Sequence, residues 1–197
     1  CGIDEAVAVL KVASGRYSDY DQAYKLFDKL IELQRMGRKV FRTDKKKYLQ
    51  LEEEKMKVSQ ALDKLWVDGF SDLKIDALWD GDAISPYETA MHIHGDASLF
   101  AHLETIYLGI LARRTRVATN VRRVVNAANG KTVLYFPARF DHWAVQGGDG
   151  YAAFVGGASG VSTDAQGEWW GAGASGTIPH ALIASVGGST VTSAKLF

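Results

Sequence analysis

Five polar side chains stand at or just after the ends of three short apolar runs in the second half of the chain. The runs are Thr132 to Phe136, Ala158 to Val161 and Ser175 to Ile178. Apolar runs of this length that alternate with helix-length segments predict parallel strands. The carboxyl ends of parallel strands collect at one edge of a sheet or barrel. We therefore expect the residues that follow the three runs to meet at one site: Arg139, then Ser162, Thr163 and Asp164, then His180.

Arg139 is the candidate for binding an anion. Its guanidinium can form two parallel hydrogen bonds to a carboxylate or a phosphate, which a lysine cannot reproduce. The alternative is a structural ion pair with Asp141 or Asp164, the acidic residues close to it in the expected site.

Ser162, Thr163 and Asp164 are candidates for binding a phosphorylated sugar. Hydroxyls and free backbone amides at a strand end suit phosphate or ribose oxygens, and a carboxylate suits ribose hydroxyls, Mg²⁺ or a pyridine nitrogen. The same three residues are equally typical of a helix N-cap. His180 follows Pro179 at the exit of the third run, where a neutral imidazole is nucleophilic near pH 7. A purely structural histidine is the alternative.

Weaker signals lie elsewhere in the chain. The glycines at 147, 148 and 150 resemble a phosphate-binding loop, but neither GxxxxGK[ST] nor GxGxxG follows a strand, and close helix packing explains them as well. His92 and His94 fall on one face of an expected strand, yet no third ligand lies nearby, so we expect no metal site. Trp169 and Trp170 are expected to pack rather than to stack on a ligand.

Composition excludes several classes of function. The formal net charge is zero, so neither a nucleic acid nor an anionic membrane surface is the expected partner. One cysteine excludes a disulfide framework within the chain and fits a cytoplasmic protein. No run of about 18 apolar residues and no signal-peptide pattern occurs, so we expect no membrane span.

The first half of the chain has a different character. A pattern of helical spacing begins near Ser18, whose capping box with Asp21 would open a helix that ends at Gly37. A second charged helix follows, then strands over 72–79 and 87–94, and a long helix within 99–128 that carries five arginines. Only six of 20 glycines but 18 of 23 acidic residues precede residue 101, and this shift favours a domain boundary near Asn129.

Several motifs together resemble the nicotinate phosphoribosyltransferase family. They are FPARFDH, GDGYAA, GVSTDAQ followed by two tryptophans, and GTIPHALIA, preceded by GDAISPYETAMHIHGD and SLFAHLETIYLGILARRTRVATN. The resemblance covers about residues 70–190. It implies an α/β fold: an N-terminal α+β domain over 1–129 with a helical insertion at about 18–68, then the first strand-helix units of an incomplete β/α barrel over 130–197, as in a fragment of a longer chain.

The resemblance also implies a reaction. Phosphoribose would pass from phosphoribosyl pyrophosphate (PRPP) to nicotinate, giving nicotinate mononucleotide and pyrophosphate in NAD biosynthesis. Arg139 would lie in the substrate pocket, and His180, in the GT-x-x-H motif, would be phosphorylated by ATP. Mg²⁺ would accompany PRPP, ATP would be a co-substrate, and the expected assembly is a homodimer, to which the arginine-rich helix would contribute.

One position bears on the acceptor. The stretch from Glu104 to Thr119 aligns without a gap to quinolinate phosphoribosyltransferases, in which an arginine that helps to hold a dicarboxylate occupies the position of Thr105. Its absence favours a monocarboxylate or an amide over quinolinate, and Arg139 favours the acid. Nicotinamide and quinolinate stay open as alternative acceptors. So do a non-catalytic fragment that needs a partner chain and a module that only binds phosphates.

Overall fold

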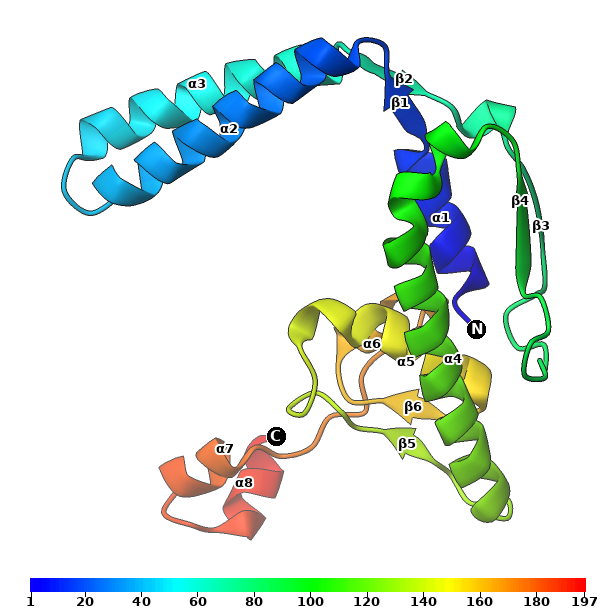
Figure 1. Ribbon diagram of the computed structural model, residues 1–197. Helices are drawn as coiled ribbons and strands as arrows, with labels where there is room; N and C mark the ends of the chain where they lie inside the picture. The colour runs from blue at the N-terminus through cyan, green and yellow to red at the C-terminus, as the bar shows by residue number, and fades with distance from the viewer. The chain divides into compact units, whose positions relative to one another are not determined.

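The computed structural model describes residues 1–197 and contains both helices and short strands (Figure 1). The helices are α1 (Ile3–Ala13), α2 (Tyr20–Val40), α3 (Lys45–Asp63), α4 (Glu104–Ala127), α5 (Gln146–Gly156), α6 (Asp164–Gly167), α7 (His180–Ser185) and α8 (Thr190–Leu196). The strands are β1 (Gly15–Tyr17), β2 (Trp66–Asp68), β3 (Lys74–Ala77), β4 (Met91–His94), β5 (Leu134–Tyr135) and β6 (Gly160–Val161). The strands form three separate two-stranded sheets, ordered β1-β2, β3-β4 and β5-β6.

Contacts between residues divide the chain into two compact units. One unit comprises residues 1–6, 77–90 and 106–197, and the other comprises residues 7–76 and 91–105. This division follows contacts in space, whereas the expected boundary near Asn129 rests on composition. The boundary at 129 and the status of 18–68 as an insertion stay predictions.

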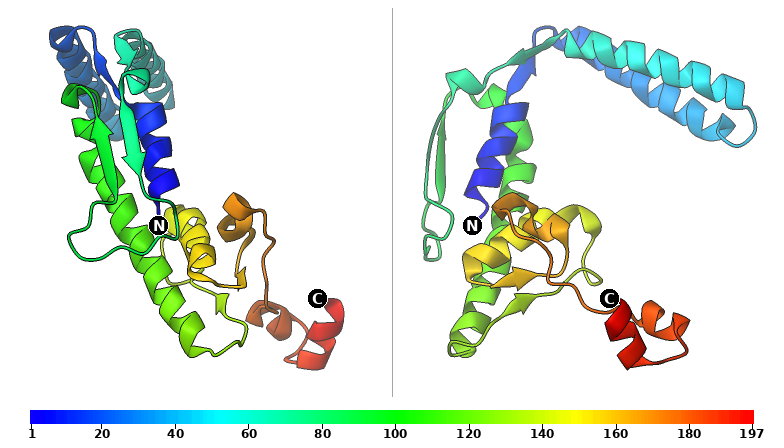
Figure 2. Two further views of the ribbon diagram at one scale, coloured as in Figure 1. Left: turned by 90° about the vertical axis from the view of Figure 1, so that its right-hand side faces the viewer. Right: turned by 180° about the vertical axis from the view of Figure 1, so that it is seen from behind.

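The helices expected after Ser18 form an antiparallel hairpin of α2 and α3 (Figures 1 and 2). Their contact is apolar, because the side chains of α2 that recur at intervals of three and four residues meet their counterparts on α3. Buried Leu33, Leu51 and Val58 form its centre, with Leu26, Leu30 and Val40 packed against them.

The predicted ends of α2 were both wrong. Asp19, not Ser18, is the N-cap, and its carboxylate accepts a hydrogen bond from the Gln22 amide at 2.9 Å. The Ser18 hydroxyl instead donates to the carbonyl of Leu65. Gly37 does not end the helix, which continues to Val40, because Gly37 is buried on the face that packs against Tyr48 of α3 and no side chain is needed there.

The base of the hairpin is closed by the antiparallel pair β1-β2. Arg16 lies opposite Val67, and Tyr17 lies opposite Trp66. The ring of Tyr17 makes edge-to-face contacts with Trp66 and with Phe27 of α2, at centroid distances of 5.1 and 5.6 Å.

The strands expected over 72–79 and 87–94 are present in shortened form as β3 and β4. On β4 the rings of His92 and His94 stack with centroids 5.9 Å apart, as their shared face predicted. His94 also lies 3.3 Å from the carboxylate of Asp76 on β3. No group of three or more potential ligands that could hold a metal ion occurs in the structure.

Two of the three predicted parallel strands form. β5 and β6 pair in parallel, with Leu134 opposite Gly160 and Tyr135 opposite Val161. The third run, 175–178, is not a strand, and only the Ser175 amide reaches the carbonyl of Val161, at 2.7 Å. Glycines at 171, 173 and 176 give this segment little side chain to pack, and Gly is unfavourable in a strand interior. The structure is therefore a mixed helix and strand fold without a closed barrel.

The helices around this strand pair bury small residues. Val121 of α4, Ala153 of α5 and Ala158 form one cluster, with Val117 and Tyr135 packed against it. None of the helices combines the length and the hydrophobicity that crossing a lipid bilayer requires.

Candidate functional site

The parallel pairing of β5 with β6 places the segments that follow these strands at one edge. Arg139 lies in the first of these segments, in a turn where the amides of Phe140 and Asp141 both donate to the carbonyl of Pro137. Its side chain is exposed and forms no hydrogen bond or ion pair. Ser162, Thr163 and Asp164 form the second segment, directly after β6.

Neither structural ion pair considered for Arg139 is formed. The carboxylate of Asp141 is bound by Arg113 of α4 at 3.0 Å. One carboxylate oxygen of Asp164 accepts a hydrogen bond from the Ala174 amide at 2.9 Å. The Arg139 guanidinium therefore keeps its full capacity for an external anion.

The residues Ser162, Thr163 and Asp164 form the N-terminus of α6. This is the helix N-cap that the sequence offered as the alternative to a ligand-binding role. Thr163 is the N-cap, in a capping box with Gln166. The side-chain oxygen of Gln166 accepts from the Ser162 amide at 3.0 Å, the Ser162 hydroxyl at 2.8 Å and the Thr163 amide at 3.2 Å. The second oxygen of Asp164 and the lone pairs of the Ser162 hydroxyl remain available to a ligand.

His180 is the first residue of α7 and its side chain is exposed. No hydrogen bond or ion pair joins its imidazole to Arg139 or to the segment 162–164. The structure thus brings the ends of β5 and β6 to one edge and does not link His180 to them.

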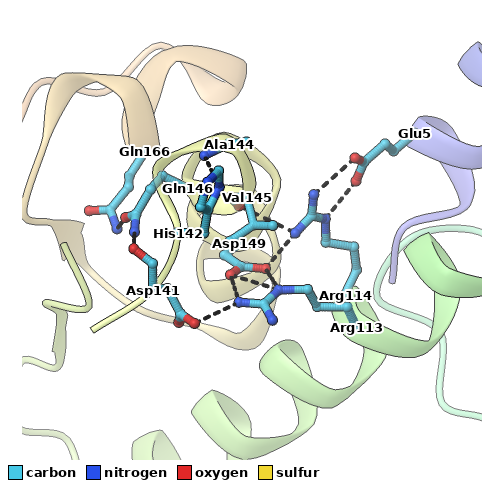
Figure 3. A network of polar contacts seen from close by, with 10 residues as sticks. All are labelled: Glu5, Arg113, Arg114, Asp141, His142, Ala144, Val145, Gln146, Asp149 and Gln166. Atoms are coloured by element: carbon cyan, nitrogen blue, oxygen red, sulfur yellow. Dashed lines mark hydrogen bonds and ion pairs between the residues drawn. The ribbon is translucent and has the colours of Figure 1, made fainter. Parts of the chain in front are cut away.

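Two buried glutamines, absent from the predicted site, join the two segments of this edge (Figure 3). Gln166 is fully buried, and its amide nitrogen donates to the side-chain oxygen of Gln146 at 2.5 Å. The amide nitrogen of Gln146 in turn donates to the backbone carbonyl of Asp141 at 3.1 Å. This bridge fixes the Arg139 turn relative to the turn at Ser162. No local pattern marks it, because glutamine is ordinarily a surface residue.

The arginines of α4 have a structural role that their sequence pattern did not indicate. Arg114 is buried, binds both carboxylate oxygens of Glu5 at 2.6 and 2.9 Å, and also donates to the carboxylate of Asp149 (Figure 3). Arg113 makes three further hydrogen bonds to Asp149, which is almost fully buried. Arg114 therefore lies in the interior of the chain, whereas the Arg113 side chain keeps 40% of its surface accessible. A contribution of the arginine-rich helix to a dimer stays a prediction.

These charges shift the pKa values of their neighbours. The hydrogen bonds that Arg113 donates to Asp149 raise the pKa of Arg113 above its ordinary value, despite partial burial. Burial by itself would lower the pKa of Arg114, but the hydrogen bond and charge of Glu5, together with Asp149, outweigh it and raise the pKa. Burial, reinforced by the negative charges of Asp149 and Asp141, raises the pKa of the Tyr135 hydroxyl on β5 to about 12.

The glycines at 147–150 are helix-packing residues. All lie within α5, and a Cβ atom on Gly148 would stand 2.1 Å from the Arg114 guanidinium. A Cβ on Gly150 would stand 2.1 Å from the Gln166 carbonyl oxygen. Trp170 stacks on Phe154 of α5 with ring centroids 4.3 Å apart, so packing accounts for it as well.

Comparisons with known proteins give an informative similarity to a solved structure. No family model matches the chain, and no curated protein matches it. Among solved structures, the chain is similar to a crystal structure of nicotinate-nucleotide pyrophosphorylase from Pyrococcus furiosus. The identity is 39%, the TM-score is 0.55, and the match covers 59% of this chain. The match spans about 30% of the length of the Pyrococcus protein. It supports the resemblance to phosphoribosyltransferases and leaves the acceptor open.

Proposed function

We propose that this chain takes part in phosphoribosyl transfer from PRPP to nicotinate, giving nicotinate mononucleotide and pyrophosphate for NAD biosynthesis in the cytoplasm. The observation that carries the proposal is the shared edge of β5 and β6, where the Gln146–Gln166 bridge joins the turn that carries the uncommitted Arg139 guanidinium to the turn that carries Ser162 and Asp164. The similar Pyrococcus protein is named for a nicotinate nucleotide and pyrophosphate, the two products of this reaction.

The residues of this edge have complementary roles. The Arg139 guanidinium binds the nicotinate carboxylate by two parallel hydrogen bonds. The Ser162 hydroxyl, which already donates to Gln166, accepts a hydrogen bond from a ribose hydroxyl, and Asp164 accepts another through its free oxygen. Thr163 holds the turn in position as the N-cap of α6.

The reaction requires positioning rather than a protein nucleophile at carbon. The pyridine nitrogen attacks the anomeric carbon of PRPP, a C–N bond forms, and the C–O bond to pyrophosphate breaks. The ribose acquires oxocarbenium character, which nearby carboxylate charge stabilises. The residues fit a Mg²⁺ ion carried by the substrate phosphates, because Asp164 has one free carboxylate oxygen and no cluster of acidic ligands exists for a resident ion. Mg²⁺ would neutralise the departing pyrophosphate.

His180 is proposed as the site of phosphorylation by ATP. Its exposed imidazole has no competing hydrogen bond and can attack the terminal phosphorus of ATP. A phosphorus–nitrogen bond forms, the bond to ADP breaks, and the resulting phosphoramidate is labile. The role of this step is to couple ATP hydrolysis to transfer.

The experiment incubates the chain with ATP, Mg²⁺, PRPP and labelled nicotinate and follows labelled mononucleotide. The variants His180→Ala and Arg139→Ala are assayed in parallel. His142→Ala is the control for His180→Ala, because His142 is a histidine with no role in the proposed chemistry. Product that falls at least about tenfold in Arg139→Ala supports the carboxylate role. If the chain forms product from quinolinate, with release of carbon dioxide, or from nicotinamide, that compound would replace nicotinate as the proposed acceptor.

A second candidate is a chain that contributes part of a site completed by a partner chain. The structure favours this candidate in one respect, because its parallel strands are limited to the pair β5-β6 and form no closed barrel. Absence of product from all three acceptors, with PRPP still bound in calorimetry, would select it. Absence of both product and PRPP binding would overturn the proposed site.

A further inference from the structure

Helix α2 carries two apolar stripes, and only one of them is covered. Residues of the first stripe recur at spacings of three and four and face α3: Ala23, Leu26, Leu30, Leu33, Gly37 and Val40. The second stripe has the same period on the adjacent face and is apolar over its first part, Tyr20, Tyr24, Phe27 and Ile31, which the polar Gln34 and Arg38 continue. A helix with two such stripes is typical of one that packs against two neighbours.

The second stripe is exposed in this chain. Tyr20, Tyr24, Phe27 and Ile31 keep 49%, 67%, 39% and 47% of their surface accessible. At the base of the hairpin the stripe continues into a hollow of about 700 Å³ lined by aromatic side chains, among them Tyr17 and Trp66. Contiguous apolar surface of this kind marks an interaction site.

The charges beside the stripe identify its partner. Every seventh residue along one flank is charged: Asp21, Asp28 and Arg35 lie on α2, and Arg42 follows in the turn just after the helix ends at Val40. All four are exposed, and none forms an ion pair within the chain. The row has two negative charges followed by two positive charges. If a second copy of the row runs in the opposite direction beside it, each negative charge lies opposite a positive charge. In an antiparallel helix pair, residues at the same flanking heptad position, e or g, of the two helices lie opposite one another across the contact.

We propose that this face binds the same face of a second copy of the chain, forming an antiparallel four-helix bundle from two hairpins. Asp28 of one copy then lies near Arg35 of the other, and Asp21 lies near Arg42. Phe27 lies against the Arg38 guanidinium of the second copy, an arrangement that favours a cation–π contact. The contact is isologous and closes as a dimer.

The dimensions of the face are sufficient for such a contact. Helix α2 has 21 residues and is therefore about 30 Å long. With α3 beside it, the hairpin presents a face of two helix widths, which approaches the roughly 800 Å² per partner of a standard interface. This proposal does not depend on the phosphoribosyl transfer reaction, because none of its residues lies in residues 130–197.

Sedimentation equilibrium of the full chain tests the proposal. We expect the unmodified chain to dimerise. Asp28→Arg and Arg35→Asp each place like charges opposite one another at two symmetric positions, so each variant is expected to weaken the dimer at least about tenfold. The double variant Asp28→Arg/Arg35→Asp restores opposite charges and is expected to dimerise as the unmodified chain does.

Mixing the two single variants provides a second measurement. Asp28→Arg chains and Arg35→Asp chains are complementary at both positions, so an equimolar mixture is expected to form a heterodimer although neither variant dimerises well alone. Lys25→Asp, an exposed charge change on the opposite side of α2, is the control and leaves association unchanged. A monomeric unmodified chain at about 100 μM, or a dimer that is insensitive to both single variants, would overturn the proposal. Circular dichroism verifies that the variants keep their helices.

Discussion

Arg114 of α4 and Asp149 of α5 form a buried ion pair, with 8% and 1% of their side-chain surfaces accessible. Both partners have further contacts, since Arg114 also binds Glu5 and Asp149 also binds Arg113. Four charges thus neutralise one another and tie α5, whose first residue Gln146 supports the candidate site, to the long helix α4.

Asp149→Asn is expected to destabilise the chain strongly. The amide keeps the size of the carboxylate but removes the buried charge that Arg113 and Arg114 share. Each arginine then keeps one acidic partner, Asp141 for Arg113 and Glu5 for Arg114. Breaking a buried pair costs about 3 kcal/mol or more of unfolding free energy. Urea denaturation measures the change. Asp164→Asn, an exposed carboxylate, is the control and is expected to change stability by less than about 0.5 kcal/mol. Equal effects of the two substitutions would contradict the structural role given to Asp149.

Two glycine substitutions are expected to act in opposite directions. Gly150→Ala places a Cβ 2.1 Å from the Gln166 carbonyl oxygen, so α5 and α6 must move apart and stability falls. Gly109→Ala lies within α4 with no atom within 4 Å of the added carbon, so the better helix propensity of alanine raises stability by about 0.5 to 1 kcal/mol. Thermal denaturation of both variants reports the two signs, and a stabilising Gly150→Ala would refute the close approach of α5 and α6.

Tyr135 is expected to make stability depend on alkaline pH. Its pKa is raised to about 12 in the folded chain, from an ordinary value of 10.0. Between these values the unfolded tyrosine has lost its proton and the folded one has kept it, so the free energy of unfolding falls as pH rises from 10 toward 12. Below pH 10 the group contributes no pH dependence.

The Tyr135→Phe variant isolates this contribution. The pH-dependent loss of stability above pH 10 is expected to be smaller in the variant than in the unmodified chain. The tyrosinate absorbance of the unmodified chain, minus that of the variant, is expected to titrate near pH 12, and a difference that titrates near pH 10 would be inconsistent with burial beside Asp149.

Gln166→Met tests the glutamine bridge. Methionine fills a similar volume but accepts no comparable hydrogen bond, so the amides of Ser162 and Thr163 lose their acceptor. An unsatisfied buried donor costs about 1 to 3 kcal/mol. Hydrogen exchange is expected to accelerate at these two amides, while amides in the middle of α2 keep their rates. Unchanged exchange at Ser162 would show that the bridge does not hold this turn.

Regular local patterns allowed much of the fold to be predicted. The helical periods of α2, α3 and α4 and the alternation of β3 and β4 are visible in the sequence, because each depends on neighbours within a few residues. The parallel pair β5-β6 was also expected. The strand predicted at 175–178 was wrong, since its apolar residues are outweighed by the glycines around them.

The interactions around the candidate site were less accessible from the sequence. Arg113 and Asp149 are 36 residues apart, and Arg114 and Glu5 are 109 residues apart, so no local spacing connects them. Gln146 and Gln166 likewise meet only after α5 and α6 have packed. The residues proposed to contact substrate, such as Arg139 and His180, followed from strand ends and from the family resemblance, and their roles stay predictions.

The pairing of β1 with β2 has a consequence for how the length of the hairpin can change. Because Tyr17 lies opposite Trp66, the residues at which the chain enters and leaves the α2-α3 hairpin are neighbours in space. The hairpin between them can therefore change in length without separating these two residues. Removing seven residues from each helix would shorten the arm by about 10 Å and keep the two stripes in phase. We therefore expect the β1-β2 pair to tolerate deletions or additions of whole heptads. The length of the α2-α3 hairpin can then vary independently of the rest of the fold.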